Sequence, residues 1–129
     1  MMKLATMSGL LLLILCATIL SQNQEKKDPC ADAQSQAEMN MCWGKEYKAA
    51  DAKMNKTYQD FMSKLDESEK MQLKNAQLAW LKYRDANCDF VADLYKGGTM
   101  RPMIAAICLA DVTNARVNEL KSQIKDREP

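Results

Sequence analysis

The chain of 129 residues is long enough for one domain, and its 18 Lys and Arg residues nearly balance its 17 Asp and Glu residues. This near-zero net charge argues against a general nucleic-acid-binding surface, which would need a cationic excess. The chain contains no histidine, so a nucleophile–base pair would have to use Lys, Asp or Glu as the base. We therefore expect that the protein is not an enzyme.

The first segment, residues 1–21, is predicted to be a secretory signal peptide. Lys3 precedes the apolar run LLLLILCATIL, which is too short for a transmembrane helix and is followed by polar residues. We expect cleavage after about Ser21, which removes one basic residue, leaves a net charge of zero and leaves no stable membrane anchor. Lipidation at Cys16 is not favoured, because Leu15 stands where a small residue is expected.

Four cysteines remain after this cleavage: Cys30, Cys42, Cys88 and Cys108. An even number of cysteines in a small exported domain indicates two disulfides formed in an oxidising compartment. The sequence has no C-x-x-C motif, and a zinc site without histidine would need four thiolates at unconventional spacing. We therefore expect no metal and no cofactor.

A polar N-terminal segment, residues 22–34, leads into a helical domain predicted over residues 35–129. Ser35 and Glu38 fit a capping box, in which the hydroxyl accepts from the helix start and the Glu reaches back. Apolar residues then recur at spacings of three and four through residues 39–65. This pattern predicts one long amphipathic helix.

Two further helices are predicted. Asp66 and Glu69 repeat the cap pattern, and residues 97–98, both glycine, are expected to end the second helix. The expected core stripe of this helix is Leu73, Ala76, Trp80, Tyr83, Cys88, Val91 and Leu94. Thr99 is expected to cap the third helix, with Pro102 tolerated in its first turn. Short connections make consecutive helices antiparallel, so the predicted fold is all-α, with three long antiparallel helices in a disulfide-stapled hairpin array.

Antiparallel pairing predicts which cysteines meet. Counting outward from the turn near Gly98 places Cys88 level with Cys108, within the distance of about 7 Å that a disulfide needs. Cys30 precedes its helix closely enough to fold back on Cys42. We favour Cys30–Cys42 with Cys88–Cys108, and the same counting permits Cys42–Cys88 with Cys30–Cys108.

The stretch LKNAQLAWLKYRDANC, residues 73–88, carries polar side chains that need partners. Counting from the first turn places Gln77 level with Asn55 and brings Arg84 towards Asp51. A buried guanidinium requires an anion or several acceptors, so we expect an Arg84–Asp51 pair. The predicted structural network comprises Asp51, Asn55, Tyr58, Gln77, Trp80, Tyr83, Arg84 and Asp85. We interpret these residues as scaffold.

Several patterns within residues 28–124 carry a family resemblance. They are C-x11-C, EMNMC, ADAKMNKTY, L-K-x-A-Q-x-x-W-x-x-Y-R-D-x-x-C and C-L-x-x-x-T-x-x-R-x-x-x-L. Together they make the chain resemble the bacterial LprI-type lysozyme-inhibitor domain, and they add Arg116 to the predicted network. The resemblance implies a helical, disulfide-bonded domain that is periplasmic or secreted. Lysozyme inhibition is the activity attached to the family name.

We hypothesise an exported binding module that blocks a lysozyme or another cell-wall hydrolase. Exposed acids near residues 97–98 or near the 66–69 turn would face the partner. An alternative from a different class is a periplasmic structural or envelope-stress module without a hydrolase target. A third hypothesis is a small-ligand carrier with a pocket near Trp43 and Trp80. The patterns specify neither contact residues nor an oligomeric state.

Overall fold

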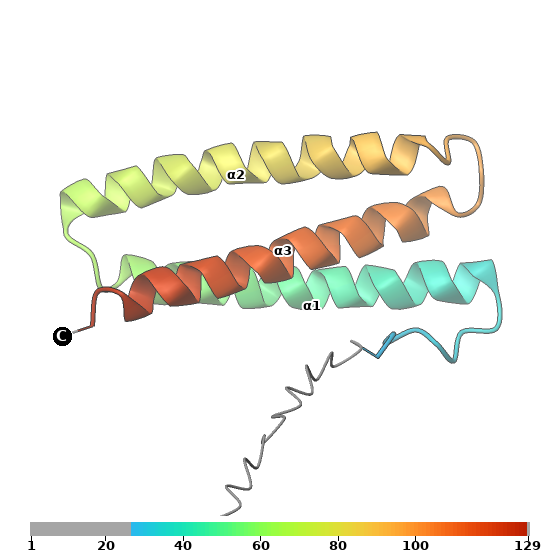
Figure 1. Cartoon of the computed structure of the whole chain (residues 1–129), viewed down its shortest axis with the longest axis horizontal. Coiled ribbons are helices and arrows are strands. Elements are labelled where there is room, and N and C mark those ends of the chain that lie inside the picture. The colour runs from blue at the N-terminus through green and yellow to red at the C-terminus, as the bar shows by residue number, and fades with distance from the viewer. Residues whose placement is uncertain (1–26, 129) are drawn as a thin grey trace, which may run out of the picture.

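The described part of the computed structural model, residues 27–128, forms three α-helices and no strand. Helix α1 spans Gln36–Met62, α2 spans Glu67–Asp93 and α3 spans Arg101–Lys125. Figure 1 shows that α2 runs opposite to α1 and α3, which confirms the predicted all-α hairpin array. None of these helices combines the length and the hydropathy that a membrane span requires. The predicted signal peptide and its cleavage site lie outside the described residues.

The first two helices begin with side-chain caps. Ser35 Oγ accepts from the backbone N–H of Glu38 at 3.2 Å, and Glu38 accepts from the backbone N–H of Gln34, one residue earlier than in a standard capping box. At the start of α2 the box is complete. Asp66 accepts from the Glu69 backbone at 2.8 Å, and Glu69 accepts from the Asp66 backbone at 3.2 Å. These caps fix the start of each helix as the sequence predicts.

The connection between α2 and α3 differs from the prediction. Helix α2 ends at Asp93, before the glycines, and Gly97 then turns the chain with a φ of 82°, a conformation that favours glycine. The prediction that Thr99 caps α3 is wrong, because the N-cap residue is Met100 and it makes no side-chain cap bond. The carbonyl of Thr99 instead accepts from Asn40 at 3.1 Å, which ties this turn to α1.

Helix α3 packs against both α1 and α2 and joins them into one body. At the end of the bundle near the α1–α2 turn, four buried residues form an apolar cluster: Phe61, Leu65, Leu73 and Leu120. Tyr58, Met62 and Ile124 pack against this cluster. This cluster therefore closes one end of the bundle, while smaller buried residues such as Ala92 and Ala110 continue the core toward the other end.

The core face of α2 is rotated from the predicted stripe. The buried residues are Leu73, Gln77, Arg84, Cys88 and Ala92. Of the predicted stripe, four residues are exposed, so their assignment to the core is wrong: Ala76, Tyr83 (60%), Val91 (39%) and Leu94 (83%). Two polar residues take the inward positions because they have partners on the other helices. Apolar periodicity alone therefore misassigned these positions, although Leu73 and Cys88 of the same stripe are buried as predicted.

The two disulfides are Cys30–Cys42, with a Cα–Cα distance of 5.9 Å, and Cys88–Cys108, at 5.5 Å. The favoured pairing is confirmed, and the alternative pairing is wrong. Both bridges lie at the end of the bundle that carries the α2–α3 turn, because Cys42 and Cys108 lie early in their helices and Cys88 lies late in α2. This end is held covalently, whereas the opposite end is held by the apolar cluster.

Replacing both cysteines of one bridge with alanine is expected to lower the free energy of unfolding by about 3 kcal/mol. The reason is that each bridge restricts the unfolded chain over a sequence separation of 12 or 20 residues. Urea denaturation of the C30A/C42A and C88A/C108A variants measures this loss. The exposed substitution Gln59→Ala serves as control, and a variant as stable as this control would contradict the expectation.

Candidate functional site

A buried arginine joins α1 and α2 near the middle of the bundle. The Arg84 side chain is only 7% exposed, and its Nη1 lies 3.0 Å from Asp51 Oδ1 while its Nε donates to Asp85 Oδ1 at 2.8 Å. Asn55 in turn donates to the other oxygen of Asp51 at 3.2 Å. The charge of a buried guanidinium is costly unless it is paired in this way. This contact fixes how α2 is rotated relative to α1.

Aromatic rings complete the surroundings of this arginine. The Arg84 guanidinium lies over the rings of Tyr47, at 5.5 Å, and Trp80, at 5.3 Å. Trp80 also receives the guanidinium of Arg116 from α3, at 5.7 Å. Such cation–π contacts are each worth about 0.5–2 kcal/mol, depending on how far they are desolvated. Trp80 therefore connects the two buried arginines.

A second polar chain crosses from α3 to α1. Arg116 donates to Gln77 Oε1 at 3.1 Å and to Glu119 Oε2 at 2.8 Å. Gln77 then donates to the sulfur of Met54 at 2.8 Å, rather than to Asn55, which the sequence placed opposite it. These hydrogen bonds link side chains of all three helices, whereas the buried hydroxyl of Thr113 on α3 makes no hydrogen bond within the described residues.

The structure does not gather every residue that the sequence assigned to the network. Tyr58 packs against the apolar cluster, at the end of the bundle opposite the disulfides. Tyr83 points outward and is 60% exposed. The polar cluster that the structure brings together is Tyr47, Asp51, Asn55, Gln77, Trp80, Arg84, Asp85, Arg116 and Glu119. Tyr47 and Glu119 were missed. The only signal in the sequence that could have placed Tyr47 in this cluster is its position, one helical turn before Asp51.

The charge states of Arg84 and Tyr47 are fixed around neutral pH, because the pKa of each is raised above its ordinary value. Burial lowers the pKa of Arg84. Hydrogen bonds with Asp85 and Asp51 and the electrostatic interaction with Tyr47 raise it by more, so the pKa of Arg84 lies above its ordinary value. Burial raises the pKa of Tyr47, against the opposing effect of Arg84. The arginine therefore stays charged and the tyrosine stays neutral. This arrangement is suited to holding helices together.

The acids at the two turns named by the sequence are engaged within the chain. At the α1–α2 turn, Glu67 pairs with Lys70 at 2.7 Å, and Glu69 caps α2 and lies 3.9 Å from Arg127. At the other end, Arg101 pairs with Asp93 at 2.8 Å. Charges of both signs therefore alternate at both turns, and neither turn forms a concentrated acidic patch.

The α2–α3 turn, residues 94–100, is the candidate functional surface. Arg101 also approaches Asp89, at 3.7 Å, and Gln36 of α1 contacts Met103 at 3.5 Å, so both flanking helices are anchored beside the turn. The turn exposes Leu94, Tyr95 and Met100. A loop that is held rigidly by its scaffold is a common location for binding residues.

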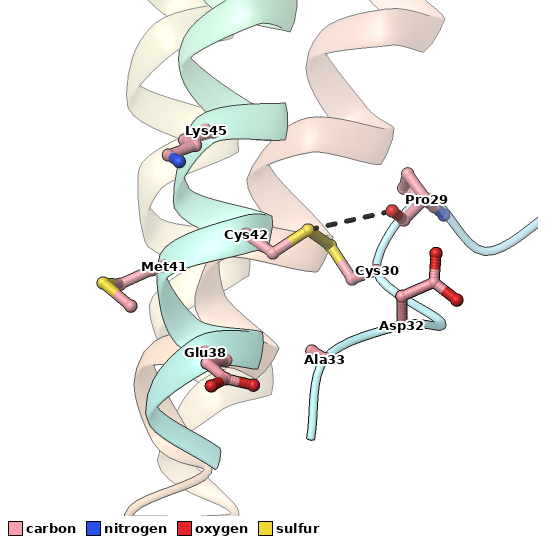
Figure 2. Close-up of a pocket in the computed structure, with 8 residues that line it drawn as sticks. All are labelled: Pro29, Cys30, Asp32, Ala33, Glu38, Met41, Cys42 and Lys45. Atoms are coloured by element: carbon pink, nitrogen blue, oxygen red, sulfur yellow. Dashed lines mark hydrogen bonds between the residues drawn. A yellow bond between two sulfur atoms is a disulfide. The ribbon is translucent and has the colours of Figure 1, made fainter. Parts of the chain in front are cut away.

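A concave surface lies beside the Cys30–Cys42 bridge. The segment around Pro29 and the first turns of α1 enclose an open pocket of about 300 Å³. Figure 2 shows the Cys42 sulfur directed at the carbonyl of Pro29, 3.8 Å away, with Asp32 and Glu38 nearby. Neither Trp43 nor Trp80 lines this pocket. Within residues 27–128, no group of three or more Cys, Asp or Glu side chains is arranged to hold a metal.

Comparison with known proteins gives a family match. Residues 27–120 match the family model described as "Lysozyme inhibitor LprI". The chain is also similar to an uncharacterized protein of Rhizobium meliloti (strain 1021), with 35% identity over an alignment 129 positions long, which covers 90% of this chain and 93% of that protein. No solved structure matches the chain.

The substitution Asp51→Asn is expected to lower the free energy of unfolding by about 1–2 kcal/mol, because it weakens the pairing of a buried guanidinium. Asp60→Asn changes an exposed acid on the same helix and serves as the matched control, with little effect expected. Urea denaturation at constant m-value measures both variants. Equal stability of the two variants would show that the Arg84–Asp51 contact does not hold the helices.

The stabilising effect of Asp93 is expected to depend on pH. The hydrogen bond from Arg101 lowers the pKa of Asp93 below its ordinary value of 3.8. A carboxylate with a lowered folded pKa stabilises the fold above the unfolded pKa, and this contribution disappears as the pH falls through the folded pKa. The difference in Tm between the parent and Asp93→Asn should therefore be present at neutral pH and absent in strong acid. A difference that persists in strong acid would contradict this.

Proposed function

The chain belongs to the LprI family of lysozyme inhibitors, and on this premise we propose that it binds and blocks a lysozyme-type cell-wall hydrolase. The observation that carries the proposal is the family match over residues 27–120, which includes all three helices up to Leu120. The two disulfides and the family together indicate an exported protein. The periplasm or the cell exterior, where cell-wall hydrolases act, is the proposed location.

We propose the α2–α3 turn as the surface that meets the hydrolase. It is an exposed, partly apolar projection at the end of the bundle where both disulfides lie. A projection that is already ordered loses little conformational entropy when it binds, so more of the contact energy appears as affinity. The buried arginine cluster supports this role indirectly, because it fixes the helices that carry the turn.

A second candidate is a periplasmic structural or envelope-stress module with no hydrolase target. The charge distribution supports it, since the acids at both turns are paired within the chain. Lysozymes are often strongly basic, and an inhibitor of a basic enzyme usually presents acids to it. In a hydrolase assay, the first candidate predicts that the protein slows the enzyme, whereas the second predicts no effect.

Purified disulfide-bonded protein is expected to slow the clearing of a cell-wall suspension by lysozyme in a turbidity assay. The slowing should appear near equimolar protein and reach a plateau in large excess, as expected for a stoichiometric complex. Protein with both bridges replaced by alanine serves as the folding control. An unchanged clearing rate at every ratio would reject inhibition and leave the second candidate.

A matched pair of charge reversals tests the proposed surface. Lys96→Glu adds acid at the α2–α3 turn, whereas Lys125→Glu adds the same charge at the opposite end of the bundle. Against a basic hydrolase at low salt, Lys96→Glu should speed association several-fold and Lys125→Glu should have a smaller effect. An equal effect of the two variants would place the contact elsewhere on the molecule.

A further inference from the structure

The side of α2 that faces away from α3 carries an exposed apolar stripe. It consists of Ala76, Ala79, Tyr83, Ala86, Phe90 and Leu94, hereafter the outward face, and all six residues are exposed. Phe90 is 80% exposed and Tyr83 is 60% exposed. In Figure 1, α2 lies along one edge of the bundle, and the exposure of all six residues shows that α1 and α3 do not cover this face.

The spacing of the outward face is that of a helix-pairing seam. The residues recur at intervals of three and four along α2, as in a coiled-coil stripe, which lies roughly opposite the buried Leu73–Ala92 side. A helix of a lone soluble protein normally exposes polar residues on the side away from the core. An apolar stripe there marks a contact with another macromolecule.

We propose that the outward face binds a second copy of this chain, with the two α2 helices antiparallel about a twofold axis. In such a pair, residue numbers rise along one helix and fall along the other. Two residues that face each other at the same height, here called level, therefore always have residue numbers with the same sum. If Tyr83 lies level with Ala86 of the second copy, then Phe90 lies level with Ala79 of the second copy. Each bulky ring therefore meets a small side chain, and the symmetry provides each of these pairings twice.

The charges beside the outward face favour a second copy as the occupant. Lys82 and Asp89 are both exposed and lie on the same flank of the stripe, seven residues apart. In an antiparallel pair, equivalent flanks of the two helices face each other. In this register, Asp89 of the second copy lies level with Trp80. Lys82 is two residues farther along the helix, a distance of about 3 Å along the axis, so its side chain can reach Asp89 of the second copy. A flank of one sign would repel its own copy, whereas this flank complements itself.

The size of the aromatic side chains fits the area that such an interface needs. Tyr and Phe side chains bury about 150–250 Å² each when they are covered. The four rings contributed by two copies would therefore supply most of the roughly 1,000 Å² that a specific interface requires. Leu94 and the alanines extend the contact along the stripe.

Sedimentation equilibrium of the purified disulfide-bonded protein tests the proposal. We expect a concentration-dependent dimer, and Phe90→Ser should weaken its dimer Kd by at least about tenfold, as for a central interface residue. Leu78→Ser is the matched control, because Leu78 is 50% exposed on the same helix but lies about 120° from Phe90. A protein that stays monomeric at every concentration would overturn the proposal, as would equal weakening by the two variants.

A charge swap tests the antiparallel register independently. Lys82→Glu and Asp89→Lys should each weaken the dimer, because each places like charges opposite one another, and the double variant should restore it. Failure of the double variant to restore the dimer would overturn this register. If Phe90→Ser leaves the dimer intact but abolishes slowing in the turbidity assay, the outward face belongs to the hydrolase contact instead. Dimerisation is measured without hydrolase, so its outcome does not depend on the proposed function.

Discussion

The pairing of two buried arginines is the constraint on which the arrangement of this bundle depends. Arg84 and Arg116 lie on different helices, are each only 7% exposed, and share Trp80 as an aromatic neighbour. A guanidinium can be buried only when acceptors surround it, so Asp51 on α1 and Gln77 on α2 must face inward at matching heights. This requirement sets the rotation and the register of the three helices together.

Different forces hold the two ends of the bundle on either side of this polar centre. Leucine and phenylalanine side chains close the end near the α1–α2 turn, and two disulfides close the end that carries the α2–α3 turn. The covalent end needs little apolar core of its own, which leaves apolar side chains such as Phe90 and Leu94 on the surface. The same division therefore leaves exposed the apolar side chains on which both proposed contact surfaces rest.

The second half of α2 shows why sequence reasoning succeeded only in part. The level of Arg84 relative to Asp51 follows from helix length and turn position, and it could be counted along the chain. The side of α2 that faces the core could not be read from apolar periodicity, because Gln77 and Arg84 occupy core positions and Tyr83 does not. A polar residue is buried here because its partners lie on other helices, and a local pattern contains no information about those partners.

The sequence by itself determined the three helices, the caps at Ser35 and Asp66, and the pairs of cysteines that could meet. These features depend on neighbours along the chain and on the number of residues between turns. Only the tertiary structure decided which cysteine pairing forms, that Thr99 binds Asn40 through its carbonyl rather than capping α3, and that Tyr83 lies outward. Those features depend on how far each helix is rotated about its axis, which is fixed by contacts between residues distant in the sequence.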